Sequence, residues 1–400
     1  MHFDLHLRRT VRDQIENLAG RMAAWDLEAR IPDESWTRMV EAITPFEHQS
    51  RSEGLVVGGV DGSGDYPGLA YGDCFVHLTV AAGTIYAAHP LSGLREAHSP
   101  SGPLVEFTWV STRATQCRDA LLESFGRLAG IPVEQVIRES DYRLLKVGRQ
   151  GPEDLQAGLI IPPAHDGANL GIQLRTTGEL GAALRLIESV EPGSLVLFDG
   201  TLSLPFVQRE PQSLFFEHLR RLCCVRARDR GVIFAALSKS HGLPNHLRLE
   251  EAAHRRMGVR DPEHWFLRFP DPARDGWTFL PADGPQIPPV GAVSYLVRLH
   301  RSTPIMRLDL DAAHWQAHLR GETPEETRSR EAEFFGRLDY ASHDQRSFGY
   351  PYPLKAAHDR ASLTGPERSI LRKQIIEAAM AAGMKRSTFK DPSQLTGHRK

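Results

Sequence analysis

Two segments of the sequence carry side chains that could bind a divalent metal ion. They are Val60-Asp61-Gly62-Ser63 and Phe198-Asp199-Gly200-Thr201, and in both an apolar run ends on Asp, Gly and a hydroxyl residue. A strand holds a carboxylate at its end rigidly, and the following glycine allows the chain or a phosphate to approach closely. Mg²⁺ and Mn²⁺ prefer such oxygen ligands. Asp-Gly is also a common turn, but its occurrence after two apolar strands favours one shared metal site.

A site of this kind needs a third carboxylate, and the helix expected at 178–190 offers Glu179 and Glu188. Both residues flank the apolar stripe of the helix, so helical phase does not distinguish them. The helix leads by a short turn into the strand expected at 195–198 and must run back against it. With rises of about 1.5 Å per helical residue and about 3.3 Å per strand residue, Glu179 comes level with Asp199. Glu179 is therefore the predicted third acid, and the alternative is an acid favoured by the first helical turn.

The elements that must position these acids follow from hydrophobic periodicity. Strands are expected at residues 55–60, 74–81, 84–88, 195–198, 232–237, 292–299 and 305–310, with Ala82-Gly83 as the turn of a hairpin. Helices are expected over an N-terminal arm at 7–47 and at 118–128, 178–190 and 214–225. A final helix has Thr364 as its cap, Pro366 in its first turn and Gly383 after its last apolar residues. This mixture predicts an α/β domain.

Composition indicates a soluble globular protein, because 41% of the 400 residues are hydrophobic and 24% are charged. The four cysteines have no paired spacing, which indicates a reducing compartment. The first residues mix charges without an apolar core, and no apolar run is long enough for a membrane helix. We therefore expect a cytoplasmic protein with no membrane partner. The adjacent Cys223-Cys224 with His241 and His246 fits no common zinc spacing, and a structural role is expected for them.

Basic residues gather in three places although the net charge is −2. The clusters are Arg220, Arg221, Arg226, Arg228 and Arg230; Arg255, Arg256 and Arg260; and a tail at about 385–400 with Lys385, Arg386, Lys390, Arg399 and Lys400. Nucleic acids bind local positive patches and do not require a basic total. The alternative for each cluster is a solvated helix face or a disordered terminus.

The order of the acids along the chain resembles that of the ribonuclease-H-like fold. A strand with Asp61 is followed by a hairpin, a helix with Glu179 and a strand with Asp199. Further motifs are Leu237-Ser238-Lys239-Ser240 and Gly349-Tyr350-Pro351-Tyr352-Pro353-Leu354, with His358 eight residues after Tyr350. In this order and combination, over about residues 55–380, the chain resembles the NurA nuclease family. The fold that this implies is a mixed sheet flanked by helices, with the N-terminal arm and insertions added to it.

The resemblance implies a role for each of these residues. Asp61, Glu179 and Asp199 would hold Mn²⁺ or Mg²⁺, and a metal pair of this kind activates water and stabilises the leaving oxygen of a phosphodiester. His358 would be a further ligand or would orient the water. Tyr350 would lie near the scissile phosphate, and Lys239 would face it as a positive charge. The alternatives are a surface or core histidine, a lysine that ends a strand and a tyrosine that packs a proline-rich turn.

The resemblance also implies an activity and partners. These are single-strand endonuclease and 5′-to-3′ exonuclease activity on DNA, a homodimer, and a HerA-type hexameric ATPase that acts with it in end resection, repair or defence. The sequence has no GxxxxGK[ST] segment, which agrees with a separate motor. The expected domains are the helical arm at 1–50 and a nuclease domain at 51–400, with an irregular insertion at 90–165 and a Pro- and Gly-rich loop at 270–291. Alternatives are a catalytically weak adaptor of the motor and an RNA-directed nuclease.

Overall fold

The computed structural model describes residues 5–28, 33–64, 67–97, 102–111, 117–145, 167–203, 214–239, 246–269 and 291–389. Its strands are β1 (Ile43–Pro45), β2 (Val56–Ser63), β3 (Leu69–Tyr71), β4 (Cys74–His89), β5 (Gly93–Glu96), β6 (Leu104–Ser111), β7 (Leu195–Phe198), β8 (Ile233–Ser238), β9 (Trp265–Arg268), β10 (Ala292–Arg298), β11 (Met306–Asp311), β12 (His343–Asp344) and β13 (Ser347–Phe348). Its α-helices are α1 (Leu5–Glu28), α2 (Asp33–Ala42), α3 (Cys117–Ala129), α4 (Val133–Glu139), α5 (Gly167–Ser189), α6 (Leu214–Arg230), α7 (His246–Met257), α8 (Ala312–His318), α9 (Pro324–Ser342), α10 (Tyr352–Ala361) and α11 (Gly365–Ala381).

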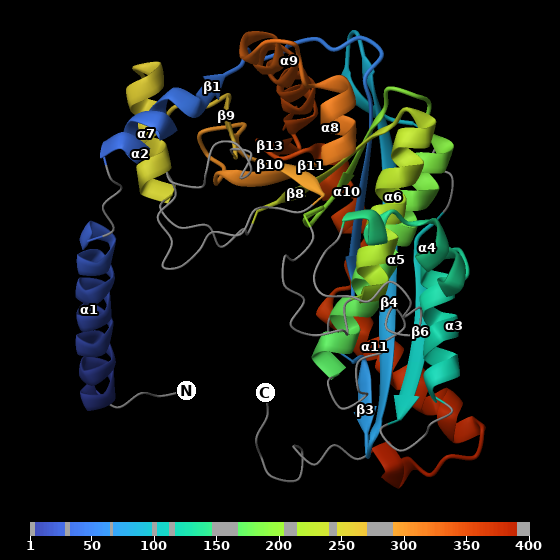
Figure 1. Cartoon of the computed structure of the whole chain (residues 1–400). Coiled ribbons are helices and arrows are strands. Elements are labelled where there is room, and N and C mark those ends of the chain that lie inside the picture. The colour runs from blue at the N-terminus through green and yellow to red at the C-terminus, as the bar shows by residue number, and fades with distance from the viewer. Residues whose placement is uncertain are drawn as a thin grey trace.

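One mixed sheet of 11 strands forms the centre of the molecule (Figure 1). Its middle has the order β6-β4-β2-β7-β8, in which β4 is antiparallel to both of its neighbours. The strands β2, β7 and β8 are parallel to one another. This is the strand order of the ribonuclease-H-like core, so the predicted fold class is confirmed. The antiparallel strands β11, β10, β9 and β1 extend the sheet beyond β8.

Strand β7 shows how the sheet is buried on both faces. Its four residues are all buried: Val196 and Phe198 belong to one hydrophobic cluster, and Leu195 and Leu197 belong to another. Alternate residues of a strand point to opposite faces. Helices α3, α4, α5 and α6 contribute to the first cluster, whereas α9 and α10 contribute to the second. Helices therefore cover both faces of β7, and the strand has no face in contact with solvent. This explains why its sequence is apolar throughout and does not alternate with polar residues.

Glycines in β2 let a helix approach the strand closely on each face. A Cβ atom at Gly58 would lie 3.1 Å from the Leu186 side chain of α5. A Cβ atom at Gly59 would lie 2.4 Å from the backbone of Pro353 in α10. Position 59 therefore has no room for any side chain, and α10 is fixed against the strand that carries Asp61.

The predicted hairpin at 74–88 is wrong, because β4 continues through Ala82 and Gly83 as one strand of 16 residues. These two residues pair with Asp61 and Val60 of β2 instead of forming a turn. A Cβ atom at Gly83 would lie 3.1 Å from Leu186, so the glycine provides space for α5. A glycine within an apolar run can indicate either a turn or close packing of a helix on the strand. Sequence periodicity does not distinguish these two cases.

Two other expected regions also differ from the structure. Residues 90–165 are expected to be irregular apart from one helix at 118–128. That helix is α3, but β6 before it is the third strand of the core, and α4 follows it. The helical arm is two helices, α1 and α2, and Ile43–Pro45 forms β1, which pairs with β9. β-branched residues before a proline favour an extended backbone over a helix. The loop expected at 270–291 lies outside the described residues except for Gly291.

The other strands and helices that the sequence predicted are present within a few residues, except that α5 begins well before 178 and α6 continues to Arg230. The sequence analysis predicted none of the helices α7, α8, α9 and α10, nor the strand β9. The last helix, α11, begins as predicted, with Thr364 and Glu367 forming a reciprocal capping box. Among the described helices, none combines the length and apolar character that crossing a membrane requires.

Candidate active site

The carboxylate of Asp61 lies at the edge of the sheet where β2 ends. It is buried, and its Oδ2 atom is 2.7 Å from Nδ1 of His358 on α10. Its Oδ1 atom accepts a hydrogen bond from the backbone N–H of Gly62. Helix α10 is held along the sheet by Thr84, which donates to the carbonyl of Pro353, and by Ser63, which donates to that of Ala361. Asp61 and His358 are therefore fixed relative to each other from both ends of α10.

Asp199 follows β7 directly, on the strand next to Asp61. Its Oδ2 atom accepts a hydrogen bond of 3.2 Å from the hydroxyl of Tyr350. Burial raises the pKa of Asp199, and the nearby negative charge of Asp61 raises it further, while Lys239 and Tyr350 lower it. Parallel neighbouring strands bring the two aspartates to the same edge of the sheet. Their mutual repulsion is the condition under which a cation binds favourably between carboxylates.

Glu179 lies on α5 and is buried against the other side of β2. A Cβ atom at Gly62 would lie 2.9 Å from Cγ of Glu179, so the two residues are in direct contact. Nε of Arg175, one helical turn earlier, lies 3.3 Å from Oε1 of Glu179. Glu188 is exposed on the same helix. The third acid selected by helix height is therefore located beside Asp61-Gly62.

Tyr350 and Lys239 meet beside Asp199. Nζ of Lys239, just after β8, lies 3.8 Å from the centre of the Tyr350 ring. Tyr350 is mostly buried, and burial followed by the charges of Asp199 and Asp61 raises its pKa well above the usual value. Tyr350 is therefore a neutral hydrogen-bond donor at neutral pH. The exposed Lys239 ammonium supplies a positive charge at the rim.

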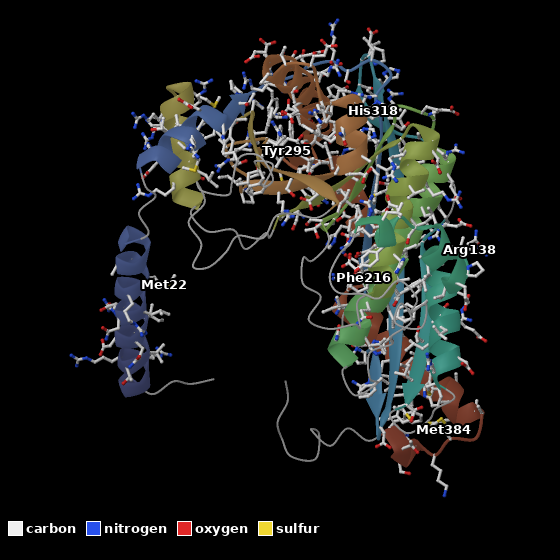
Figure 2. The ribbon with its side chains drawn as sticks, in the orientation of Figure 1. Met22, Arg138, Phe216, Tyr295, His318 and Met384 are labelled. Carbon is white, nitrogen blue, oxygen red and sulfur yellow. The ribbon has the colours of Figure 1, made fainter. Side chains whose placement is uncertain are left out.

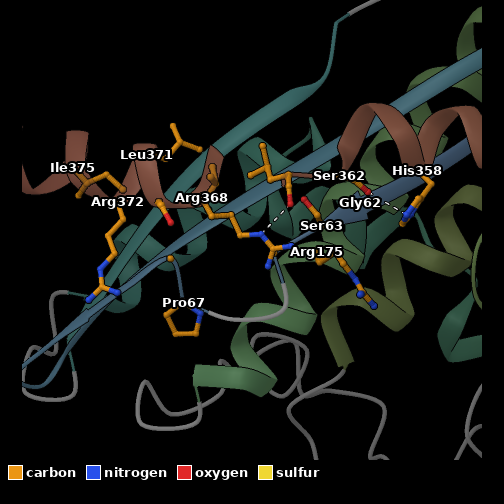
Figure 3. Close-up of a pocket in the computed structure, with 15 residues that line it drawn as sticks. Gly62, Ser63, Pro67, Arg175, His358, Ser362, Arg368, Leu371, Arg372 and Ile375 are labelled. Atoms are coloured by element: carbon orange, nitrogen blue, oxygen red, sulfur yellow. Dashed lines mark hydrogen bonds between the residues drawn. The ribbon is translucent and has the colours of Figure 1, made fainter. Parts of the chain in front are cut away.

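A cavity of about 500 Å³ opens next to the acids (Figure 3). Its polar lining includes Arg175, His358, Arg368 and Arg372, and the last two come from α11. Arg175, Arg368 and Arg372 were not selected from the sequence. Their only sequence signal is the four-residue spacing, which places Arg175 beside Glu179 and Arg368 beside Arg372 on one helical face. These side chains form a basic wall next to an acidic site.

The first basic cluster predicted as a possible nucleic-acid surface is used inside the protein. Arg221 is 1% exposed and lies between Asp141 and Asp311, at 2.7 Å and 2.8 Å. Arg228 contacts the same two acids. Arg220 pairs with Glu217, and Arg226 pairs with Glu139. Arg221, Arg226 and Arg228 therefore join α6 to neighbouring segments, whereas Arg220 pairs within the helix. A solvated helix face is the wrong alternative for these four, and only Arg230 of the cluster is exposed.

Comparison with protein families adds to this geometry. The model of the NurA domain matches residues 158–363, which is more than half of the chain. The chain belongs to the NurA family. As a member of this nuclease family, it is a metal-dependent phosphodiester hydrolase.

Solved NurA structures are similar to the chain. The NurA nuclease from Sulfolobus solfataricus is 14% identical, with a TM-score of 0.45, over 94% of this chain and 99% of that one. A structure of NurA with manganese is 10% identical, with a TM-score of 0.42, over 94% and 100% of the two chains. A structure of NurA bound to dAMP and manganese is 11% identical, with a TM-score of 0.37, over 96% and 97%. No curated protein sequence matches the chain.

The donor set of this NurA-family chain fits a hard divalent cation. Asp61, Glu179 and Asp199 offer carboxylate oxygens at one edge of the sheet, and burial together with the negative charge of Asp61 raises the pKa of Asp199. The three do not form a closed cluster by themselves. Asp61 is bonded to His358, and Glu179 is paired with Arg175. A bound cation would compete with these two partners for the carboxylates.

Proposed function

We propose that the protein is a DNA nuclease that uses Mn²⁺ or Mg²⁺ held by Asp61, Glu179 and Asp199. The observation that carries this proposal is the meeting of Asp61 and Asp199 on neighbouring parallel strands, where Asp61 contributes to the raised pKa of Asp199. Buried carboxylates that repel each other cost stability unless a cation compensates them. Manganese is also present in related NurA structures.

The chemistry that a bound divalent pair supplies is activation of a water molecule and stabilisation of the leaving oxygen. His358 would hold the Asp61 carboxylate in position, since its Nδ1 contacts Asp61 and its Nε2 lies 3.2 Å from the hydroxyl of Ser362. With both ring nitrogens engaged, this positioning role fits His358 better than direct ligation. Tyr350 would donate a hydrogen bond to Asp199 and keep that carboxylate turned towards Asp61.

The basic residues would bind the phosphates of the strand being cut. Arg175, Arg368 and Arg372 line the cavity next to the acids, and Lys239 lies beside Tyr350. Guanidinium groups bind phosphate oxygens through two parallel hydrogen bonds, which favours arginine in such walls. DNA would therefore pass along α11 and bring one phosphodiester to the acids.

Cleavage of labelled single-stranded DNA with Mn²⁺ tests this function. We expect cutting that stops with chelator and falls by at least about 10³-fold in Asp61→Ala, because the scissile phosphate loses its metal. Asp359→Asn is the matched control, since this exposed acid of α10 pairs only with Lys355 among the described residues. Activity that survives chelation or Asp61→Ala would refute the metal mechanism.

Two parallel assays separate the other functions that the sequence left open. An RNA strand of the same sequence tests for an RNA-directed nuclease, and preferential cutting of RNA would replace the proposed substrate. A catalytically silent adaptor would cut neither strand and would still bind its partner after Asp199→Asn.

The proposed cellular role is DNA end resection with a HerA-type hexameric ATPase, and it is supported by the family. Pull-down of the ATPase with the purified protein tests the partnership, and cleavage of end-labelled duplex with ATP tests resection. If the ATPase neither binds nor changes cleavage, the partnership is excluded.

The proposed homodimer is supported by exposed apolar side chains. Val105, Phe107 and Trp109 alternate along β6 and are each about half exposed, and Met22 on α1 is exposed away from the sheet (Figure 2). Exposed apolar side chains grouped along one strand, as on β6, favour association. Sedimentation should give a dimer that Phe107→Glu dissociates, and a monomeric native protein would exclude it.

A further inference from the structure

Four side chains outside the acidic site converge on one point of the fold. They are His48 after β1, His264 before β9, Asp339 near the end of α9, and His343 directly after that helix. Each offers one ligand atom, and these atoms all lie within 4.8 Å of one another. Asp339 and His343 are four residues apart, so the end of one helix contributes two members. The other two members come from segments far away in the sequence.

The carboxylate of Asp339 is the centre of the group. Its side chain is fully buried, and its Oδ2 atom lies 2.7 Å from Nδ1 of His48. Its Oδ1 atom lies 2.9 Å from Nδ1 of His343 and 3.4 Å from Nε2 of His264. The centres of the three imidazole rings are 4.5 to 5.5 Å apart. Three imidazoles therefore surround one carboxylate.

Two atoms in this group are buried without a hydrogen bond. Nε2 of His264 and Nδ1 of His343 both form ion-pair contacts with Oδ1 of Asp339, but among the described residues neither this oxygen nor Nε2 of His264 has a hydrogen bond of good geometry. The nearby Nδ1 of His343 is also 3.1 Å from the backbone carbonyl of Asp339. A buried polar atom whose hydrogen bond is poorly formed destabilises the folded state, and a charged atom does so more strongly. A cation bound to both atoms would satisfy them together.

The backbone supports this arrangement. His264 has a φ angle of +58°, a left-handed conformation that non-glycine residues adopt rarely. Such conformations persist where the surrounding structure requires them and cluster at ligand sites. Here the bend directs the ring towards Asp339. The side chain of His48 is 42% exposed, so the cluster opens to solvent on that side.

We propose that His48, His264, Asp339 and His343 bind one Zn²⁺ ion. Zinc takes four ligands in a tetrahedron and accepts imidazole nitrogen together with carboxylate oxygen. The carboxylates of the candidate active site instead suit Mn²⁺ or Mg²⁺, so the two sites differ in metal preference. The proposal does not depend on nuclease activity.

The bound ion would cross-link three segments of the chain. His48 follows the strand β1, His264 precedes its partner β9, and His343 begins the β12–β13 hairpin that leads to Tyr350. The N–H of Gly349 already donates to the carbonyl of Ser342 and closes this hairpin. Zinc would add a cross-link between the edge of the sheet and the end of α9. Its role is to stabilise the fold, as in other sites where all ligands come from the protein.

Metal analysis of a tag-free protein tests the proposal. After incubation with Zn²⁺ and dialysis, we expect about one equivalent of zinc per chain. His48→Ala and Asp339→Asn should each lose it, whereas His318→Ala should retain it because His318 lies on α8, outside the cluster. His48 is half-exposed, so His48→Ala keeps the test valid even if Asp339→Asn fails to fold. Native protein without zinc, or unchanged zinc in His48→Ala, would overturn the proposal.

Two further measurements separate this site from the acidic one. Zinc content should be unchanged in Asp61→Ala, and loss there would assign the ion to the acidic site instead. Co²⁺ in place of Zn²⁺ should give the strong visible absorption of a tetrahedral ion, and His48→Ala should abolish it. Zn²⁺ should also raise the Tm of the native protein and leave that of His48→Ala unchanged, because only a ligand bound by the folded state stabilises it. A Tm that rises equally in both would refute the site.

Discussion

Gly62 is in contact with Glu179 across the interface of β2 and α5. A Cβ atom at position 62 would lie 2.9 Å from Cγ of Glu179 and 3.1 Å from Cγ of Arg175. The glycine of the first Asp-Gly motif therefore has a packing function. It allows a carboxylate and a guanidinium from a helix to lie directly beside Asp61.

Gly62→Ala should displace both of these side chains without unfolding the protein. We expect a fall of about 10-fold or more in cleavage, because misplacing catalytic groups by small distances is costly. Gly68→Ala is the control, since a Cβ there would meet only the carbonyl of Val76, at 3.8 Å. Steady-state cleavage and circular dichroism of both variants check this. Equal activity in the two would mean that the contact has no role in catalysis.

Glu179→Gln should abolish most of the activity, with a loss of at least about 10²-fold, because it removes the proposed metal ligand and keeps the shape of the side chain. Glu188→Gln changes an exposed acid of the same helix and should leave cleavage within about two-fold. Mn²⁺ titrations of both variants give the apparent affinity. Similar behaviour of the two glutamates would exclude Glu179 as the third acid.

Asp199→Asn should separate stability from activity. Burial and Asp61 raise the pKa of Asp199, so the folded state without metal is destabilised by ionisation, and its stability increases as pH falls through this pKa. Removing the charge should raise the Tm in chelator by roughly 1–3 °C while cleavage is lost. Thermal unfolding at neutral pH measures this. A lower Tm would show that the carboxylate is already compensated within the protein.

His77 on β4 should make the protein sensitive to acid. It is fully buried, neither ring nitrogen has a hydrogen-bond partner among the described residues, and burial lowers its pKa to about 4. A histidine with a lowered pKa stabilises the fold above its ordinary pKa of about 6.5, and this contribution is lost as pH falls towards about 4. Near pH 5 the loss is about 2 kcal/mol.

His77→Leu should therefore reduce the difference in unfolding free energy between about pH 7.5 and about pH 5. Urea unfolding at the two pH values measures it. His89→Gln, at the partly exposed end of the same strand, should keep the native difference. If His77→Leu also keeps that difference, another group causes the acid sensitivity.

Arg221→Gln should destabilise the protein by about 3–5 kcal/mol, because it leaves the carboxylates of Asp141 and Asp311 without this buried partner. Arg138→Gln removes a largely exposed arginine and should have little effect. Urea unfolding measures both. The affinity of the folded Arg221→Gln protein for DNA should stay unchanged. A specific loss of affinity would show that the arginine cluster of α6 contacts DNA.

Local sequence patterns were sufficient to predict a strand or helix when its own residues determine its conformation. The apolar run before Asp199 predicted β7, and Thr364 with Pro366 predicted the start of α11. Helix height also distinguished Glu179, which is buried beside Gly62, from the exposed Glu188. Strand and helix rises are fixed by backbone geometry, so they can be used without knowledge of the tertiary structure.

The sequence alone therefore determined the fold class, the two aspartates and the order of the elements that carry them. Only the tertiary structure decided that Ala82-Gly83 lies within a strand, that Arg221 is buried between two acids, and that His48 and His264 meet Asp339. In each case the deciding interaction joins residues far apart in the chain. Propensity and periodicity describe neighbours along the chain, whereas packing and charge pairing depend on which distant segments the sheet brings together.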